Sequence, residues 1–168
     1  MSAKITHDAT HQLRALRTGT VTPRELMAET LDRIEDINPG INAIVALRRR
    51  DVLLTEAENA RPGPLQGMPI AIEDPAETAQ ILTTCGSPAF RNHVPAVHSP
   101  MVTRMRRAAA VINGKTNTPE FGLGSHSYNP VYGFTRNPMS RRVPPGEPVG
   151  VRARLWPAAW LPLPTVST

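Results

Sequence analysis

Two adjacent carboxylates, Glu73 and Asp74, follow the short apolar run Ile70-Ala71-Ile72. Such a run is typical of a strand in the middle of a sheet that is covered on both faces. Gly67 and Pro69 interrupt regular structure just before it. Because an unpaired buried charge is costly, a carboxylate at the end of a buried strand is either paired or has a chemical role. Glu73 is therefore the first candidate for a chemical role.

Other side chains that could do chemistry give weaker indications. The single Cys85 excludes an internal disulfide and cannot build a zinc site, and in its Thr- and Gly-rich loop a small buried thiol is commoner than a nucleophile. Lys115 lies in Gly-Lys-Thr, but position 109, where a phosphate-binding loop needs Gly, is Ala. The five histidines are scattered along the chain, and ordinary surface or loop histidines are commoner than metal ligands: His7, His11, His93, His98 and His126. We expect no metal and no cofactor.

The first half of the chain predicts helices around one strand. Residues 8–16 form a plausible short helix, and Thr22-Pro23-Arg24-Glu25 is a start signal for a second, with Thr as N-cap. Asn38-Pro39-Gly40 is expected to end it. A short strand is predicted within residues 41–47, followed by a helix over 48–60. The second helix has one apolar face: Leu26, Thr30, Leu31, Ile34 and Ile37.

The second half continues the alternation of helix and strand. A small-residue loop is predicted at 83–87, and Ser99-Pro100 starts another helix. A short strand, Val111-Ile112, is expected to end before Gly114. This alternation favours an α/β layer arrangement. The buried face of the helix after Pro100 is predicted to hold Met101, Val102, Met105 and Ala109.

Composition restricts the partners. A 168-residue chain with 40% hydrophobic residues is long enough for one globular domain or for part of a larger one. No apolar run approaches the roughly 20 residues of a membrane span, and the first residues show no charged segment followed by an apolar one, so we expect a cytoplasmic protein without a membrane partner. Of the net charge of +5, residues 141–154 supply +3, with four Arg against Glu147. This basicity is local and lacks interleaved aromatics, so nucleic-acid binding is not expected.

Four blocks of the sequence, in order, resemble the amidase-signature family over residues 5–138. The resemblance implies an α/β fold of helices packed on a mixed sheet, of which this chain is the N-terminal and incomplete portion. It also implies hydrolysis of a carboxylic amide to an acid and ammonia or an amine, through a Ser–Ser–Lys triad. The blocks are LQGMPIAI at 65–72, TTCGSPAF at 83–90, GKTNTPEF at 114–121 and NPVYGFTRNP at 129–138.

The resemblance assigns roles to individual positions. The family's Lys, which must be neutral to act as base, falls at Glu73. A carboxylate there has a shorter stem, carries the opposite charge and repels the developing oxyanion, so we expect Glu73 not to be functional. The resemblance places Lys115 in the core near the site. The substrate-facing loop of the family corresponds to Gly122, Leu123, Gly124 and Ser125.

The sequence after Pro138 departs from the family. A Gly/Ser-rich block with the relay Ser is expected there, whereas the chain continues with Met139-Ser140-Arg141 and reaches Thr168 without it. Codons for residues 145–157, read in a shifted frame, are compatible with Thr-Pro-Gly-Gly-(Thr/Ala)-Ser-Gly-Gly and an Ala-rich segment. We therefore interpret residues 139–168 as a frameshifted, Pro- and Arg-rich tail, which its six Pro between 144 and 164 predict to be disordered.

These observations leave three hypotheses. We favour a partial amidase-signature domain at 1–138, with a helical segment at 1–64 and a sheet-and-helix segment at 65–138, truncated and without catalysis. The others are an active hydrolase of a small amide, and a non-catalytic binding module that pairs with an intact amidase. A fragment with open strand edges is also expected to self-aggregate.

Overall fold

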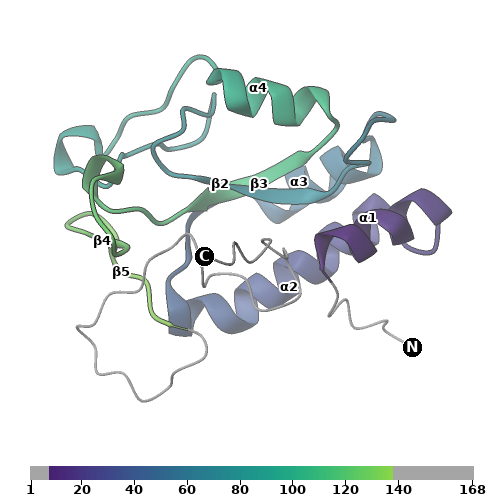
Figure 1. The fold of residues 1–168 in the computed structure, drawn as a ribbon, viewed down its shortest axis with the longest axis horizontal. Coiled ribbons are helices and arrows are strands. Elements are labelled where there is room, and N and C mark those ends of the chain that lie inside the picture. The colour runs from purple at the N-terminus through teal and green to yellow at the C-terminus, as the bar shows by residue number, and fades with distance from the viewer. Residues whose placement is uncertain (1–7, 138–168) are drawn as a thin grey trace, which may run out of the picture.

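The computed structural model describes residues 8–137 of the chain. Within them, a three-stranded sheet lies between helices, with α4 (Pro100–Arg107) on one face and α2 (Pro23–Ile41) and α3 (Arg50–Glu58) on the other (Figure 1). The strands are β1 (Ile44–Leu47), β2 (Pro69–Glu73) and β3 (Val111–Thr116). The tail interpreted as frameshifted lies outside the described residues.

The sheet has the order β1-β3-β2, so β3 is its central strand. It pairs antiparallel with β1 and parallel with β2. The prediction that residues 70–72 occupy the middle of the sheet is therefore wrong, since β2 pairs on one side only within the described residues. The predicted end of β3 at Gly114 is also wrong, because Gly114, Lys115 and Thr116 continue the strand and pair with β1.

Local sequence signals determine how the first two helices begin. Helix α1 (Ala9–Thr18) starts where the Asp8 carboxylate accepts the His11 N–H at 2.8 Å, and it ends at Gly19 in the left-handed region. Helix α2 starts with a reciprocal capping box, in which the Thr22 hydroxyl accepts the Glu25 N–H at 3.2 Å and Glu25 accepts the Thr22 N–H at 2.8 Å. These bonds satisfy amides that the helix itself leaves unpaired.

The end of α2 differs from the expected stop at residues 38–40. The helix continues through Pro39 to Ile41 and is capped by Asn42, whose N–H donates to the carbonyl of Asn38 at 2.7 Å. The Asn38 side chain accepts the N–H groups of Ala43 and Ile44, both at 2.8 Å. These bonds direct the chain into β1. They also stabilise the last turn of α2, which Pro39 alone does not end.

Helix α4 contacts the sheet through a narrower stripe than predicted. Val102 is fully buried, Met105 is half-buried, and Ala109 is buried but lies beyond the end of the helix. Met101 is 44% exposed, so its predicted burial is wrong. A helix of eight residues makes only two turns and presents few side chains to the sheet.

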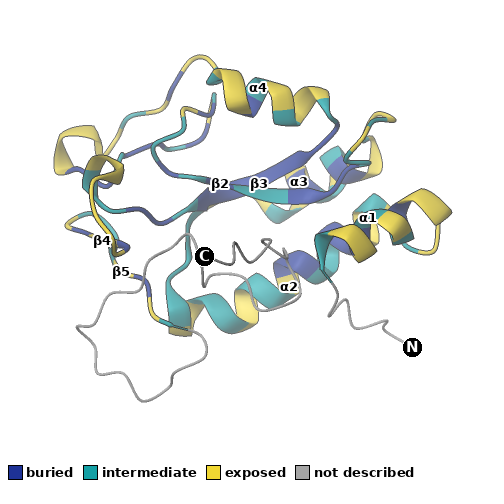
Figure 2. Cartoon of the chain, viewed as in Figure 1, coloured by how far each residue is buried: buried dark blue, intermediate teal, exposed yellow. Residues whose placement is uncertain are grey.

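The core lies on both faces of β3 (Figure 2). Val111 packs with Met27, Leu31, Leu53 and Ala57 of α2 and α3, whereas Ile112 packs on the other face. Successive side chains of a strand point to opposite faces, so this apolar pair holds two layers of helices. The second cluster contains Ile72, Ile81, Val102 and Ile112.

No helix within residues 8–137 is long and apolar enough to cross a membrane.

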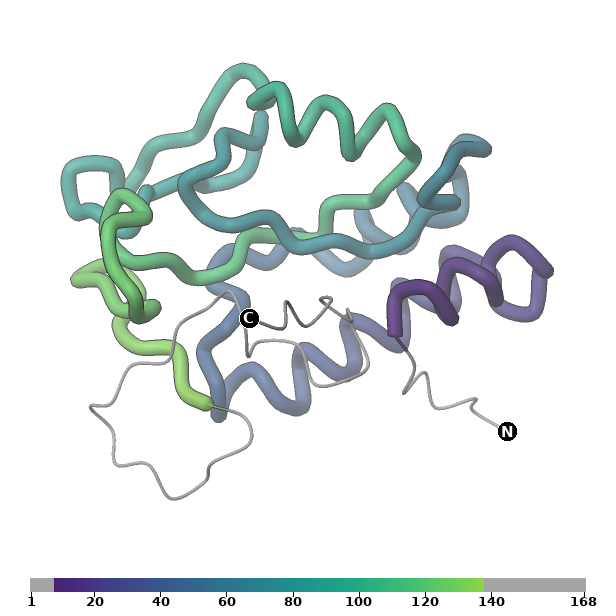
Figure 3. Tube along the Cα trace, viewed as in Figure 1, coloured from purple at the N-terminus to yellow at the C-terminus, as the bar shows by residue number. Residues whose placement is uncertain are grey.

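A long connection, residues 74–99, leads from β2 to α4 and includes the 3-10 turn Pro88–Phe90 (Figure 3). After β3 the chain forms a second 3-10 turn, Glu120–Gly122, and the small hairpin of β4 (Tyr128–Asn129) and β5 (Gly133–Phe134). Because β2 and β3 are parallel, their carboxyl ends meet at one edge of the sheet, where both connections begin.

Candidate functional site

Glu73 is the last residue of β2, and it pairs in register with Thr116 of β3. Its side chain is half-buried, and its Oε1 accepts a hydrogen bond of 3.2 Å from the hydroxyl of Thr118. The structure thus places Glu73 where the two parallel strands end. It also gives the carboxylate a neutral hydrogen-bond donor.

The fully buried carboxylate is Asp74, with no exposed surface. It accepts three hydrogen bonds: from the Thr84 N–H at 3.3 Å, the Thr84 hydroxyl at 3.1 Å and the Gly86 N–H at 3.2 Å. Gly86 has a φ of +65°, and a Cβ there would lie 3.0 Å from the Cβ of Asn129. Sequence reasoning named both carboxylates but gave a role only to Glu73, although the small-residue loop at 83–87 was a signal of close backbone approach.

Lys115 of β3 is also fully buried. Its Nζ donates to the carbonyl of Ala76 and, at 3.2 Å, to the hydroxyl of Thr78. Burial lowers the pKa of the Lys115 ammonium to about 8, because loss of solvation outweighs the opposing fields of Asp74, Cys85 and Glu77. The amine therefore binds the start of the 74–99 connection, at Ala76 and Thr78.

Cys85 lies in the loop that surrounds the Asp74 carboxylate. Burial, reinforced by the negative field of Asp74, raises the pKa of its thiol, so the thiol stays protonated at neutral pH. Its backbone carbonyl accepts the Phe121 N–H at 2.7 Å, which ties this loop to the segment after β3. Among residues 8–137, no group of three or more His, Cys, Asp or Glu side chains is placed to hold a metal ion.

A buried amide network fixes the β4–β5 hairpin against the end of β3. The Asn129 Nδ2 donates to the Asn117 Oδ1 and to the Thr118 carbonyl, both at 2.7 Å. The Asn117 Nδ2 in turn donates to the Thr135 hydroxyl at 3.0 Å. Sequence reasoning assigned these residues no role. Their signal was weak, since an isolated Asn is usually a turn residue.

The loop Gly122, Leu123, Gly124 and Ser125 lies on the surface. Gly122 and Gly124 have φ values of +72° and +156°, Leu123 is 82% exposed, and the Ser125 hydroxyl forms a 2.7 Å hydrogen bond with the Nδ1 of His126. Thr118, which precedes this loop in the chain, donates to Glu73. The edge of the sheet thus brings together a half-buried carboxylate, a buried carboxylate and an exposed glycine-containing loop.

Comparison of the sequence with known proteins identifies relatives of this chain. A family model described as Amidase matches residues 25–147. The chain is 38% identical over 148 residues to a subunit of glutamyl-tRNA(Gln) amidotransferase from Thermus thermophilus, covering 86% of this chain and 31% of the relative. The corresponding protein of Azoarcus sp. is 40% identical over 157 residues, with 87% and 32% covered.

A solved structure gives the same result for the fold. The structure of 6-aminohexanoate cyclic dimer hydrolase superimposes with a TM-score of 0.75 and 30% identity, covering 83% of this chain and 29% of that one. The chain spans about a third of the length of the curated relatives it matches.

Proposed function

Since the chain belongs to the amidase family, we propose that it derives from an enzyme that hydrolyses a carboxylic amide to an acid and ammonia or an amine. The match over residues 25–147 and the likeness of its fold to amide hydrolases support this reaction class. The residues that would select the amide lie mostly outside the third of the family that this chain represents.

We further propose that this polypeptide does not itself catalyse the reaction. The observation that carries this proposal is the presence of Glu73 at the position where the family resemblance places the lysine base. A neutral amine can take a proton from a serine and then carries a positive charge. A carboxylate at the same place instead adds negative charge beside the oxyanion that forms during amide hydrolysis. The bond from Thr118 holds Glu73 at the strand end.

Lys115 does not replace the missing base in this proposal. Its lowered pKa suits a base, but its side chain is fully buried and its Nζ already donates to Ala76 and Thr78. A base must come within about 3 Å of the proton it removes. In addition, the 168 residues contain no Gly-Gly-Ser-Ser-Gly-Gly block to supply the relay serine.

A frameshift between codons 138 and 148 is our explanation for the absent serine block. The Pro-rich composition of residues 144–164, and the shifted codon reading that restores a Gly/Ser-rich string, both support it.

An activity assay tests the proposal. The purified 168-residue chain is incubated with simple aliphatic and aryl amides, beside an intact amidase prepared in the same way. We expect no hydrolysis above background, and none from Glu73→Lys, because the serine block is also absent. The matched control is the reverse change, Lys to Glu at the equivalent position of the intact amidase, which should reduce kcat at least about a hundredfold. Hydrolysis by the chain that disappears in Glu73→Gln would contradict the proposal.

A second candidate function is a non-catalytic module that pairs with an intact amidase. The favouring observation is that β1 and β2 each pair on one side only within residues 8–137, which leaves two outer edges open to another strand. Phe121, 50% exposed, and Leu123 add apolar surface near the site. Co-purification of the tagged chain with an intact amidase as a defined complex, weakened by Leu123→Asp, is the expected result. Capture of unrelated proteins to the same extent would contradict it.

A further inference from the structure

A cavity of about 530 Å³ lies between α3 and α4, beside the start of β3. Val111, the first residue of β3, lines it, whereas Glu73 lies beside the last residue of that strand. The cavity is thus at the opposite end of the strand from the candidate site. Its volume falls within the range of about 300–1,000 Å³ that is typical of small-molecule sites.

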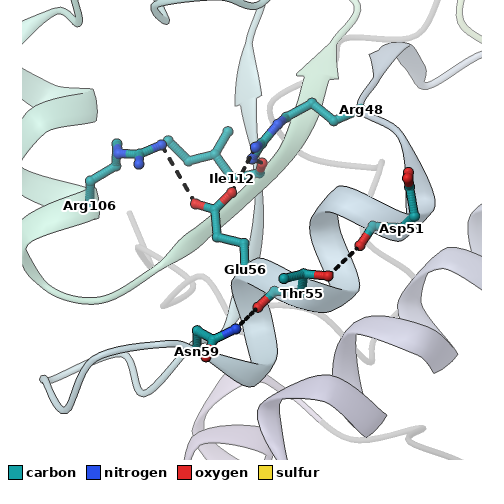
Figure 4. A network of polar contacts seen from close by, with 7 residues as sticks. All are labelled: Arg48, Asp51, Thr55, Glu56, Asn59, Arg106 and Ile112. Carbon is teal, nitrogen blue, oxygen red and sulfur yellow. Dashed lines mark hydrogen bonds and ion pairs between the residues drawn. The ribbon is translucent and has the colours of Figure 1, made fainter.

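Positive charge dominates the lining of this cavity. Arg61, Arg106 and Arg107 line it, and among residues 8–137 Glu56 is the only carboxylate that does. Figure 4 shows that Glu56 is already bound from two directions, by Arg48 at 2.7 Å and by Arg106 at 3.6 Å. The side chains of Arg61 and Arg107 make no hydrogen bond or ion pair within the described part of the chain. The cavity therefore has guanidinium groups in excess of its own acid.

Neutral donors add to these charges. His98 lines the cavity, and its Nδ1 accepts the Ala79 N–H at 3.0 Å, so the proton of the neutral ring is on Nε2. Burial and the field of Arg106 lower the pKa of His98, which keeps the ring neutral at pH 7. The hydroxyl of Thr103 lies in the same lining. Two groups that donate without carrying charge thus accompany the arginines.

We propose that this cavity binds a small molecule bearing a phosphate or diphosphate group. Guanidinium groups form paired, charge-assisted hydrogen bonds with phosphate oxygens. A phosphate monoester offers three acceptor oxygens and up to about two negative charges, which matches this excess of donors better than a single carboxylate does. The cavity is partly open to solvent, and within residues 8–137 no Phe, Tyr or Trp lines it, which favours a small molecule over single-stranded nucleic acid.

Calorimetric titration of the full chain with inorganic pyrophosphate, at constant ionic strength, tests the proposal. We expect saturable binding that Arg61→Gln and Arg107→Gln each weaken at least about tenfold, the loss of one charge-assisted contact. The matched control is Arg104→Gln, an exposed arginine of the same helix that does not line the cavity and should leave the affinity unchanged. Circular dichroism of each variant checks that α3 and α4 remain folded.

Arginine modification provides an independent measurement. Pyrophosphate should protect Arg61 and Arg107, but not Arg104, from phenylglyoxal, as read by peptide mass spectrometry. No saturable binding, or an equal loss of affinity in Arg104→Gln, would overturn the proposal. Binding of a phosphate polymer without binding of pyrophosphate would overturn it as well, since it would show a charged surface and not a small-molecule site.

Discussion

The hydroxyl of Thr84 donates a 3.1 Å hydrogen bond to the carboxylate of Asp74, ten residues earlier in the chain. With the N–H groups of Thr84 and Gly86, it surrounds that carboxylate with three donors in a fully buried position. The loop at 83–87 is therefore folded around a charge at the end of β2. This arrangement fixes the first residues of the 74–99 connection. Lys115 binds the same stretch, through Ala76 and Thr78.

Asp74→Asn should destabilise the fold by about 2–4 kcal/mol, because an amide can accept at one atom only and points two hydrogens at existing donors. Urea unfolding at pH 7 measures the change. Asp36→Asn, on the exposed surface of α2, is the matched control and should change the free energy of unfolding by less than about 0.5 kcal/mol. Equal effects in the two variants would show that the buried carboxylate is not needed.

Lys115→Met should change how stability depends on pH. Below pH 8, Lys115 is protonated in both the folded and the unfolded chain, and the folded chain bears the cost of the buried charge. Between about pH 8 and pH 10.5 the folded chain releases this proton first, so the Lys115 contribution to stability rises with pH. Over this window the wild-type chain should gain about 3 kcal/mol relative to Lys115→Met.

Unfolding of both proteins from pH 7 to 11 measures this difference. Cys85 and Tyr132, whose pKa values are raised, remain in both proteins, so their contributions are largely removed by the comparison. A pH-independent difference would mean that Lys115 keeps an ordinary pKa in the folded chain.

Gly114→Ala should separate β1 from β3. A Cβ at Gly114 would overlap the carbonyl oxygen of Ala46 and lie 3.0 Å from the Cα of Leu47, both of them backbone atoms that cannot rotate away. We expect a loss of about 2–4 kcal/mol, as for other overpacked positions, and faster amide exchange in residues 44–47. Gly40→Ala is the control, since nothing lies within 4 Å of its Cβ and it lies in a helix, where the change should stabilise by about 0.5–1 kcal/mol.

The nucleotide sequence tests the frameshift proposal. Restoring one base near codon 138 should open a long downstream reading frame that encodes a Gly/Ser-rich block. Resequencing of this interval from independent templates measures whether the shift is present in the gene. A stop codon shortly after the restored base would contradict the proposal.

The sequence predicted the parts of the fold that depend on neighbouring residues. The cap at Thr22 was predicted because a cap is recognised within a few residues. The order of the strands was not predicted, because the hydrophobic pattern of a strand shows which residues are buried and not which strand it pairs with. The polar residues of β3, Asn113 and Lys115, broke the apolar pattern, and the partners of Lys115, Ala76 and Thr78, lie more than 35 residues away.

In the candidate site, too, features set by neighbouring residues were predicted and features set by distant residues were not. The position of Glu73 followed from the apolar run before it, and the structure places it at the strand end. The bonds of Asp74 and Asn129 were not predicted because they reach across 11 or 12 residues of loop, to Gly86 and to Thr118 and Asn117. No local pattern distinguishes such a residue from an ordinary turn residue.

The place of β3 in the sheet also affects synthesis on the ribosome. β3 lies between β1 and β2, but it is the last of the three to be translated, 64 residues after Leu47. At about 5–20 residues per second, β1 waits about 3 to 13 seconds for its partner. During this interval neither emerged strand can complete a ladder, because the shared neighbour does not yet exist. A nascent chain arrested before Val111 therefore presents two unpaired strands, which makes it a natural client for a ribosome-associated chaperone.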